Sequence, residues 1–297
     1  MAEKKFATFE KKSNMELHSI DAGTFLCDGG GIFGSVPKLL WERHIKADSR
    51  NLIRLNMRCM LVKEGARNVL IETGAGEKLS WKFVQNNGIE NAQQLIDSLQ
   101  KVGCSPNDIT DVLHTHLHWD HCGGGTCFSN GKNVVPAFPN AVYHCTRAQW
   151  ENALNPNPRE DDAYFPDDLL PVAQSGQLNL LEAEGELFPG FELRIFNGHT
   201  PGMIVPVIPY KGKKIAYVSD LVPLATNVPV KWIAAYDLFP VRLMEEKQSF
   251  LREAFENNYL LFFEHDPKHE CCTLRWDDRK GPLVDQTGSF ASFFPGS

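Results

Sequence analysis

Short apolar runs typical of β-strands recur along the chain, and four of them lead into a histidine or an aspartate. These runs and the side chains that follow them are residues 111–115 with His116, 193–196 with His199, 215–219 with Asp220, and 259–263 with His265. Their length and their content of β-forming residues predict strands. Because α/β folds gather the side chains at the C-terminal ends of their strands along one edge, we expect these four side chains to line one pocket.

Helical patterns lie between the strand-like runs. Apolar side chains recur at helical spacing within residues 95–102 and again within residues 250–255, and this alternation predicts an α/β fold. The first 75 residues differ, because their β-type runs at 51–62 and 68–72 are broken by glycine, which indicates antiparallel strands. With no internal repeat and no flexible linker, we expect a single domain over residues 1–297, with an N-terminal extension and strands in 1–50.

Two segments have the character of loops with a role at a pocket. Residues 155–168 are polar, acidic and rich in proline, so we expect an exposed segment that is either a plain surface loop or a lid. Residues 221–240 follow Asp220 directly and carry Trp232, Tyr236 and Phe239. We interpret this segment as an insertion that forms a pocket wall, with ordinary core packing as the alternative.

Composition narrows the classes of function. The 297 residues are 42% hydrophobic, which supports a sizeable core, and the formal net charge of −7 disfavours a nucleic-acid partner. The start of the chain, Met1 to Lys5, is charged and lacks the apolar stretch of a signal peptide or a membrane helix. We therefore expect a cytoplasmic protein with no membrane partner, whose eight cysteines are reduced thiols.

The strongest chemical signal is the stretch His116-Leu117-His118-Trp119-Asp120-His121, which is followed by three glycines at 123–125. Imidazole nitrogens and carboxylate oxygens are good ligands for Zn²⁺. Three histidines and one aspartate within six residues can serve two ions if the loop directs alternate side chains to each. The neighbouring glycines let the backbone turn sharply beside this loop.

These six residues match His-x-His-x-Asp-His, the signature of the metallo-β-lactamase superfamily, which the chain resembles from about residue 71 to 265. The superfamily's Gly-His-Thr-Pro-Gly turn is matched at 198–202, its bridging aspartate by Asp220, and its last histidine by His265. The spacing between these markers is similar to that of the branch containing homoserine-lactone lactonases and methyl parathion hydrolase. The resemblance implies a four-layer αββα sandwich and suggests a homodimer.

The resemblance also implies a role for each candidate ligand. His116, His118 and His199 would hold one ion, Asp120, His121 and His265 would hold the second, and Asp220 would bridge the two. We therefore expect two Zn²⁺ per chain, with other divalent metals as alternatives. A hydroxide shared by two such ions is a nucleophile at neutral pH, and Asp120 would orient it or carry its proton to the leaving group. We assign His114, two residues before the motif, a supporting role.

The predicted function is hydrolysis of an ester-type bond in a small molecule, most of all an acyl homoserine lactone-like substrate. An organophosphate triester or aryl ester hydrolase is the alternative, and a non-catalytic metal-binding scaffold is the alternative from another class. Some lactonases of this branch stabilise the substrate carbonyl with a tyrosine three residues after the bridging aspartate, whereas this chain has Pro223 there. Tyr236 is the nearest candidate in sequence for that catalytic role, with a packed core tyrosine as the alternative.

Overall fold

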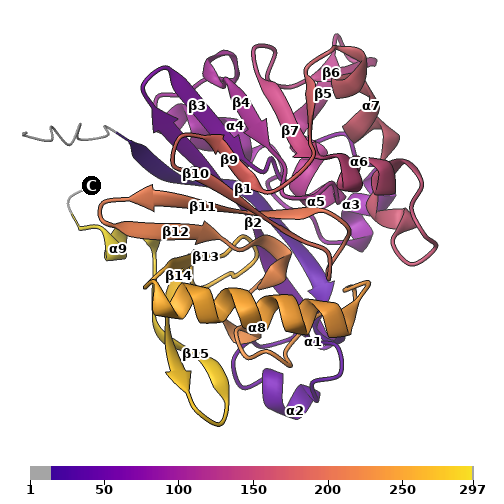
Figure 1. The fold of residues 1–297 in the computed structure, drawn as a ribbon. Coiled ribbons are helices and arrows are strands. Elements are labelled where there is room, and N and C mark those ends of the chain that lie inside the picture. The colour runs from indigo at the N-terminus through magenta and orange to yellow at the C-terminus, as the bar shows by residue number, and fades with distance from the viewer. Residues whose placement is uncertain (1–14, 296–297) are drawn as a thin grey trace, which may run out of the picture.

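Two β-sheets form the centre of the computed structural model, which describes residues 15–295 (Figure 1). The first sheet has the strand order β1 (Glu16–Asp28), β2 (Leu52–Glu64), β3 (Arg67–Ile71), β4 (Asp111–Leu113), β7 (Val142–Thr146) and β8 (Leu178–Leu181). The second has the order β15 (Gly281–Gly288), β14 (Cys271–Asp277), β13 (Leu260–Phe262), β12 (Lys213–Tyr217), β11 (Met203–Tyr210), β10 (Phe191–Phe196) and β9 (Gly185–Phe188). A separate small hairpin pairs β5 (Thr126–Ser129) with β6 (Asn133–Pro136).

The direction of pairing changes within each sheet. Strands β1, β2 and β3 are antiparallel, as the sequence predicts for the N-terminal part, while β3, β4, β7 and β8 are parallel. In the second sheet β12 and β13 are parallel and all the other neighbours are antiparallel. Consequently β10, β12 and β13 run in one direction, and the loops that follow them leave from the same edge of the sheet.

α-Helices connect and flank the strands of the two sheets. They are α1 (Gly29–Phe33), α2 (Lys38–Trp41), α3 (Trp81–Asn86), α4 (Gln94–Lys101), α5 (Trp119–Cys122), α6 (Arg147–Leu154), α7 (Pro166–Gln174), α8 (Pro240–Glu256) and α9 (Phe290–Phe293). The long helix α8 crosses the second sheet, and α4 lies on the side of the first sheet (Figure 1). The predicted helix at 95–102 is therefore confirmed as α4, and the pattern at 250–255 is the second half of α8.

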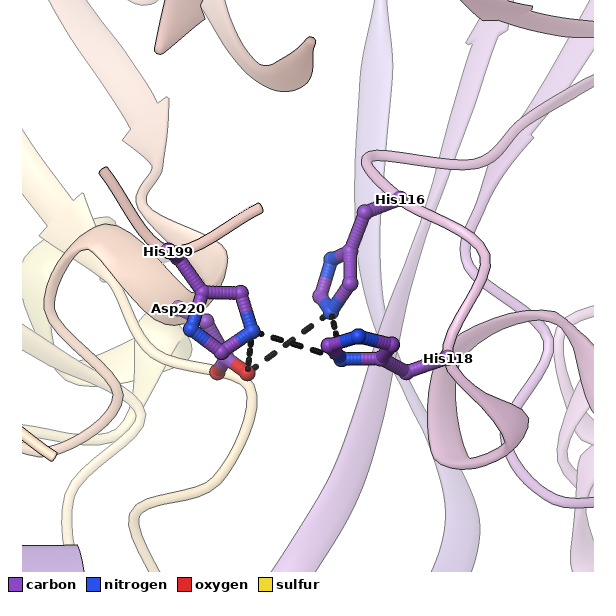
Figure 2. A group of neighbouring side chains, drawn as sticks. All are labelled: His116, His118, His199 and Asp220. Atoms are coloured by element: carbon purple, nitrogen blue, oxygen red, sulfur yellow. Dashed lines mark hydrogen bonds and ion pairs between the residues drawn. The ribbon is translucent and has the colours of Figure 1, made fainter. Parts of the chain in front are cut away.

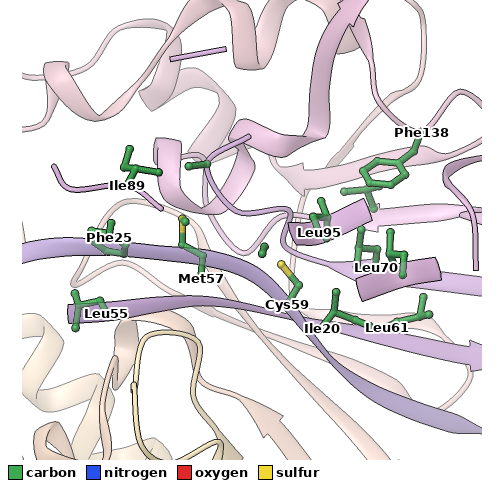
Figure 3. Close-up of a cluster of buried hydrophobic side chains, with 14 of the residues drawn as sticks. Ile20, Phe25, Leu55, Met57, Cys59, Leu61, Leu70, Ile89, Leu95 and Phe138 are labelled. Carbon is green, nitrogen blue, oxygen red and sulfur yellow. The ribbon is translucent and has the colours of Figure 1, made fainter. Parts of the chain in front are cut away.

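The layers follow from the alternation of side chains along the strands. Met60 and Val62 of β2 pack with Tyr217 of β12 in a cluster between the two sheets. Leu61 points the opposite way, into a cluster shared with α4 (Figure 3). On the far side of the second sheet, Leu261 packs in a third cluster that includes side chains of α8. This order of helices, sheet, sheet and helix is the predicted four-layer αββα sandwich.

The strand boundaries differ in part from the sequence-based expectations. Strand β4 ends at Leu113 instead of Thr115, because the Thr115 amide donates to Glu72 Oε1 at 2.8 Å and so leaves the strand ladder. The charged N-terminal segment, and any dimer contacts it would make, lie outside the described residues. Among residues 15–295 no helix is long and apolar enough to cross a bilayer, and all eight cysteines are free thiols.

Candidate metal centre

The seven side chains expected to bind metal converge at the edge where β4, β10, β12 and β13 end. His116, His118, His199 and Asp220 each place a potential ligand atom within 4.8 Å of the others (Figure 2). Asp120, His121 and His265 form a second group of the same tightness. The two groups correspond to the two ion sites that the sequence motif implies.

Asp220 lies between the two groups. Its Oδ2 is 3.2 Å from His199 Nε2, 3.7 Å from His116 Nε2 and 3.6 Å from His121 Nε2. Its Oδ1 is 3.2 Å from His265 Nε2. Burial raises the pKa of this carboxyl, but the neighbouring histidines, led by His265, lower it well below its usual range. Oδ1 is buried without a hydrogen-bond donor among residues 15–295. A carboxylate whose oxygens lie near histidines of both groups fits a position shared by two cations.

Each histidine of the two groups has its outward ring nitrogen next to an oxygen atom. These contacts are His116 Nδ1 with Thr115 Oγ1 at 3.0 Å, His118 Nε2 with Glu160 Oε2 at 3.4 Å, His121 Nδ1 with Glu264 Oε2 at 3.0 Å, His199 Nδ1 with Asp237 Oδ1 at 2.8 Å, and His265 Nδ1 with the Asn56 carbonyl at 2.8 Å. Metal-binding histidines are typically oriented in this way, because the outer contact fixes the tautomer and leaves the other nitrogen for the ion. The donor set therefore fits two divalent cations such as zinc.

Glycine next to the motif is required by close packing. A Cβ at Gly124 would lie 2.1 Å from the Thr73 carbonyl oxygen, so only glycine lets the loop after α5 pass against the segment that follows β3. The amide of Thr73 in turn donates to the His121 carbonyl at 2.8 Å. Trp119 packs edge-on against Phe25 and Phe83 beneath this loop. These contacts fix the short helix α5 and the two motif residues Asp120 and His121 on it.

The expectation that residues 155–168 form an exposed segment is wrong for its central part. Glu160 and Tyr164 are only 5% and 7% exposed. Besides its contact with His118, Glu160 accepts hydrogen bonds from Asn152, Asn157, Tyr164 and Thr200, at 2.8, 2.8, 3.1 and 3.1 Å respectively. The segment is therefore a support of the first ligand group. No spacing rule in the sequence links Glu160 to a histidine 42 residues earlier.

Two further glutamates that the motif does not include lie behind the second group. Glu72 and Glu264 are completely buried, and His121 Nδ1 is 3.6 Å from Glu72 Oε1. Burial, followed by the negative charge of Glu264, raises the pKa of Glu72 to about 7. Burial opposes protonation of His121, but Glu264, Asp120 and Asp220 raise its pKa well above the usual range. Positive charge at His121 is thus strongly favoured, whether from a proton or from a metal ion.

The segment 221–240 is divided between core and surface. Leu221, Val222 and Val228 are completely buried in the cluster with α8, so the first half is core and not the expected pocket wall. Tyr236 is 49% exposed, which excludes a packed core tyrosine, and its hydroxyl lies 3.4 Å from Cys27 Sγ. Burial of this end raises the pKa of Tyr236, and the charges of Cys27, Asp28 and Asp120 add to the effect.

Several contacts fix the position of Tyr236 and of the residues next to it. The Ala235 amide donates to the Gly31 carbonyl at 2.7 Å, and the Arg159 guanidinium donates to the Ala235 carbonyl. A Cβ at Gly31 would lie 2.3 Å from the Tyr236 hydroxyl. The next residue, Asp237, supports His199. The second half of the segment is therefore tied to the first ligand group and to the loop that carries Glu160.

Comparison with known proteins agrees with this geometry. The sequence profile of the metallo-beta-lactamase superfamily matches residues 55–265. The chain belongs to this superfamily. A probable metal-dependent hydrolase from Staphylococcus aureus is 28% identical, with a TM-score of 0.84 over 92% of this chain and 96% of that one. The dizinc quorum-quenching lactonase AidC, at 22% identity, shares the fold with a TM-score of 0.78 over 93% of this chain and 95% of its own.

Among curated proteins, an N-acyl homoserine lactonase from Bacillus thuringiensis is 28% identical over 165 residues. The match covers 51% of this chain and 57% of that lactonase, so the chain spans little more than half the length of this relative. The N-acyl homoserine lactonase AttM of Agrobacterium fabrum is 29% identical over 69 residues, which is 23% of this chain and 22% of AttM.

Proposed function

We propose that the chain is a metal-dependent hydrolase that binds two metal ions, with zinc as the preferred metal. In this proposal His116, His118 and His199 hold one ion, Asp120, His121 and His265 hold the other, and Asp220 is shared. The observation that carries the proposal is the position of the Asp220 carboxylate, which lies within 4 Å of histidines from both ligand groups. Seven potential ligands for two ions leave coordination positions for water and substrate, which is typical of catalytic sites.

The chemistry that two such ions supply is a hydroxide nucleophile at neutral pH and polarisation of the carbonyl or phosphoryl oxygen under attack. Side chains next to the two ion sites would supply the remaining steps of the reaction. The Asp120 carboxylate, whose Oδ2 lies 3.8 Å from His121 Nε2 and 3.7 Å from His265 Nε2, orients the nucleophile and carries its proton to the leaving oxygen. The Tyr236 hydroxyl is protonated at neutral pH, as an ordinary tyrosine hydroxyl is, and can donate a hydrogen bond to a substrate carbonyl.

We infer that the substrate is a lactone with an acyl tail, of the acyl homoserine lactone type. The names of the curated relatives support this substrate class. Tyr236 and Phe239, both about half exposed, provide apolar surface on the second half of the 221–240 segment, close to the ligand His199. Each buried methylene of a tail adds about 0.8 kcal/mol, so a longer tail should lower KM.

A substrate panel with the zinc-loaded protein tests this function. We expect acyl lactones to be hydrolysed faster than β-lactams, glutathione thioesters or RNA. Asp220→Ala should abolish hydrolysis, whereas Asp278→Ala, the same change at an exposed aspartate, should leave it unaltered. Phosphotriesters that outrun every lactone would establish the alternative of an organophosphate hydrolase. Metal binding without turnover of any substrate would instead support the non-catalytic scaffold.

A further inference from the structure

A cavity lies apart from the seven candidate ligands. It has a volume of about 460 Å³ and is bounded by the turn after α2, by parts of 224–232 and 266–269, and by the β14–β15 hairpin. None of the seven candidate ligands lines it. Its volume lies within the range of about 300–1,000 Å³ typical of small-molecule sites. The cavity is thus large enough for a ligand of its own.

The charge around this cavity is opposite to that of the whole chain. Arg43, Lys268 and Arg275 line it, together with two histidines, although the chain carries a net charge of −7. The described part of the chain offers none of these three cations an ion pair within 4.0 Å, and Arg275 interacts only at longer range with Asp277. Three cations around one cavity without close counter-charges favour an anion there.

The one acidic side chain in the wall does not neutralise these cations. Asp266 accepts hydrogen bonds from the backbone amides of Ala225, Lys268 and His269, at 3.0, 2.8 and 2.8 Å. Its two oxygens are therefore committed to the loop backbone, and Asp266 is 4% exposed. The wall presents cationic groups to the cavity and keeps its single carboxylate within the loop.

Apolar side chains occupy the rest of the wall. Trp232 lies edge-on to His44, with ring centroids 5.8 Å apart, and Leu283 and Val284 of β15 line the opposite side. The Lys268 ammonium donates to the His44 carbonyl at 3.0 Å, which joins the loop after β13 to the turn after α2. Most small-molecule sites have this composition of apolar surface with a few charged groups.

We propose that this cavity binds a small amphiphilic anion, a molecule with a carboxylate or phosphate head group on an apolar body. The head group contacts Arg43, Lys268 and Arg275, and the apolar body packs against Trp232, Leu283 and Val284. Cationic side chains bind both kinds of head group, so the two sources are separated by experiment. This site is independent of the hydrolytic function proposed above.

Calorimetric titration of the metal-loaded full chain with octanoate, octyl phosphate and octanol tests the proposal. We expect one molecule of octanoate or octyl phosphate to bind per chain, whichever head group is preferred, and octanol to bind at least tenfold more weakly. The variant Lys268→Gln/Arg275→Gln should lose at least tenfold in affinity for the anion. The control Arg279→Gln/Lys280→Gln removes the same charge from the tip of the same hairpin, outside the cavity, and should bind within twofold of the unaltered chain.

A carboxylate can also bind at the metal centre, but such binding is indifferent to which pair of cations is removed. Equal affinities in the unaltered chain, the cavity variant and the control would therefore overturn the proposal. So would octanol binding as tightly as the anions. Because Arg275 is exposed on β14, the single variant Arg275→Gln gives the same comparison against Arg279→Gln if the double variant does not fold.

Discussion

Glu264 and Glu160, two buried glutamates next to motif histidines, provide a test of how the candidate ligands divide between the two ion sites. Glu264 Oε2 lies 3.0 Å from His121 Nδ1, and Glu160 Oε2 lies 3.4 Å from His118 Nε2. Glu264→Gln and Glu160→Gln preserve side-chain volume and remove one negative charge each. If the proposed assignment is right, Glu264→Gln weakens the ion site that contains His121, and Glu160→Gln weakens the ion site that contains His118.

The size of each effect follows from the surroundings of the carboxylate. Losing the group that orients a metal-binding histidine typically lowers metal affinity about 10- to 100-fold. Neither oxygen of Glu264 has a hydrogen-bond donor of good geometry among residues 15–295, and its charge is the largest of those that raise the pKa of His121. The raised pKa of His121 opposes this effect, because a proton must leave before a metal binds. We therefore expect a net loss of about tenfold or more at the second site.

Glu160 should contribute less, because four other side chains share its charge. We expect a loss of about tenfold or less at the first site. Both variants are dialysed against graded chelator and analysed for metal content, and Co²⁺ titration followed by absorption distinguishes the two sites. The reasoning is refuted if Glu264→Gln leaves both affinities unchanged, or if the two variants weaken the same site.

Three further predictions use other parts of the site. The purified chain should hold about two metal ions. Asp220→Ala should lower activity and metal content more than His114→Ala, because the His114 imidazole contacts Thr73 and lies outside both ligand groups. Equal losses in matched kinetics would contradict this expectation. Tyr236→Phe should lower kcat and kcat/KM together by about tenfold or more with metal content unchanged, and unaltered kinetics would remove Tyr236 from the reaction. Burial lowers the pKa of Lys247 to about 7, so the unfolded chain binds more protons between this value and the ordinary lysine pKa, and stability should rise with pH across that window by less than about 1.4 kcal/mol per unit. Urea unfolding at several pH values should show this rise in the unaltered chain and not in Lys247→Met, and the same slope in both would contradict the assignment.

The parts of the fold that sequence patterns predicted are those set by local periodicity. The strand runs before His116, His199, Asp220 and His265 could be recognised because each run is short, largely apolar and followed within three residues by a histidine or an aspartate. The sequence does not show that Leu61 faces the opposite side of β2 from Met60 and Val62, because all three side chains are apolar. Only the presence of a layer on each face explains why a strand buried on both sides loses the polar and apolar alternation.

The supports of the metal centre could not be found by the same reasoning. Glu160 looked like part of a polar surface loop, since composition reports how soluble a segment is and not which of its carboxylates is turned inward. Its burial depends on His118, Asn152 and Thr200 being brought together by three different elements. Asp237 and Glu264 have the same property, since each reaches a ligand histidine that is distant in sequence. The candidate ligands can be recognised from short sequence patterns, whereas the residues that orient them share only a location in the fold.

The two halves of the segment 221–240 also differ in how well the sequence predicts them. The whole segment 221–240 is interpreted above as a pocket wall, but Leu221, Val222 and Val228 pack in the cluster with α8. The first exposed residue of the segment is Lys231. The change occurs where the backbone is held by three contacts. Lys247 donates to the Trp232 carbonyl at 2.9 Å, Asp237 Oδ1 lies 2.8 Å from His199 Nδ1 at the far end, and Arg159 donates to the Ala235 carbonyl between them. Because those anchors come from α8, from the first ligand group and from the loop with Glu160, the position of Tyr236 depends on the same contacts that orient the histidines. A substitution that loosens Arg159 or Lys247 should therefore alter kcat through Tyr236 before it alters the metal content.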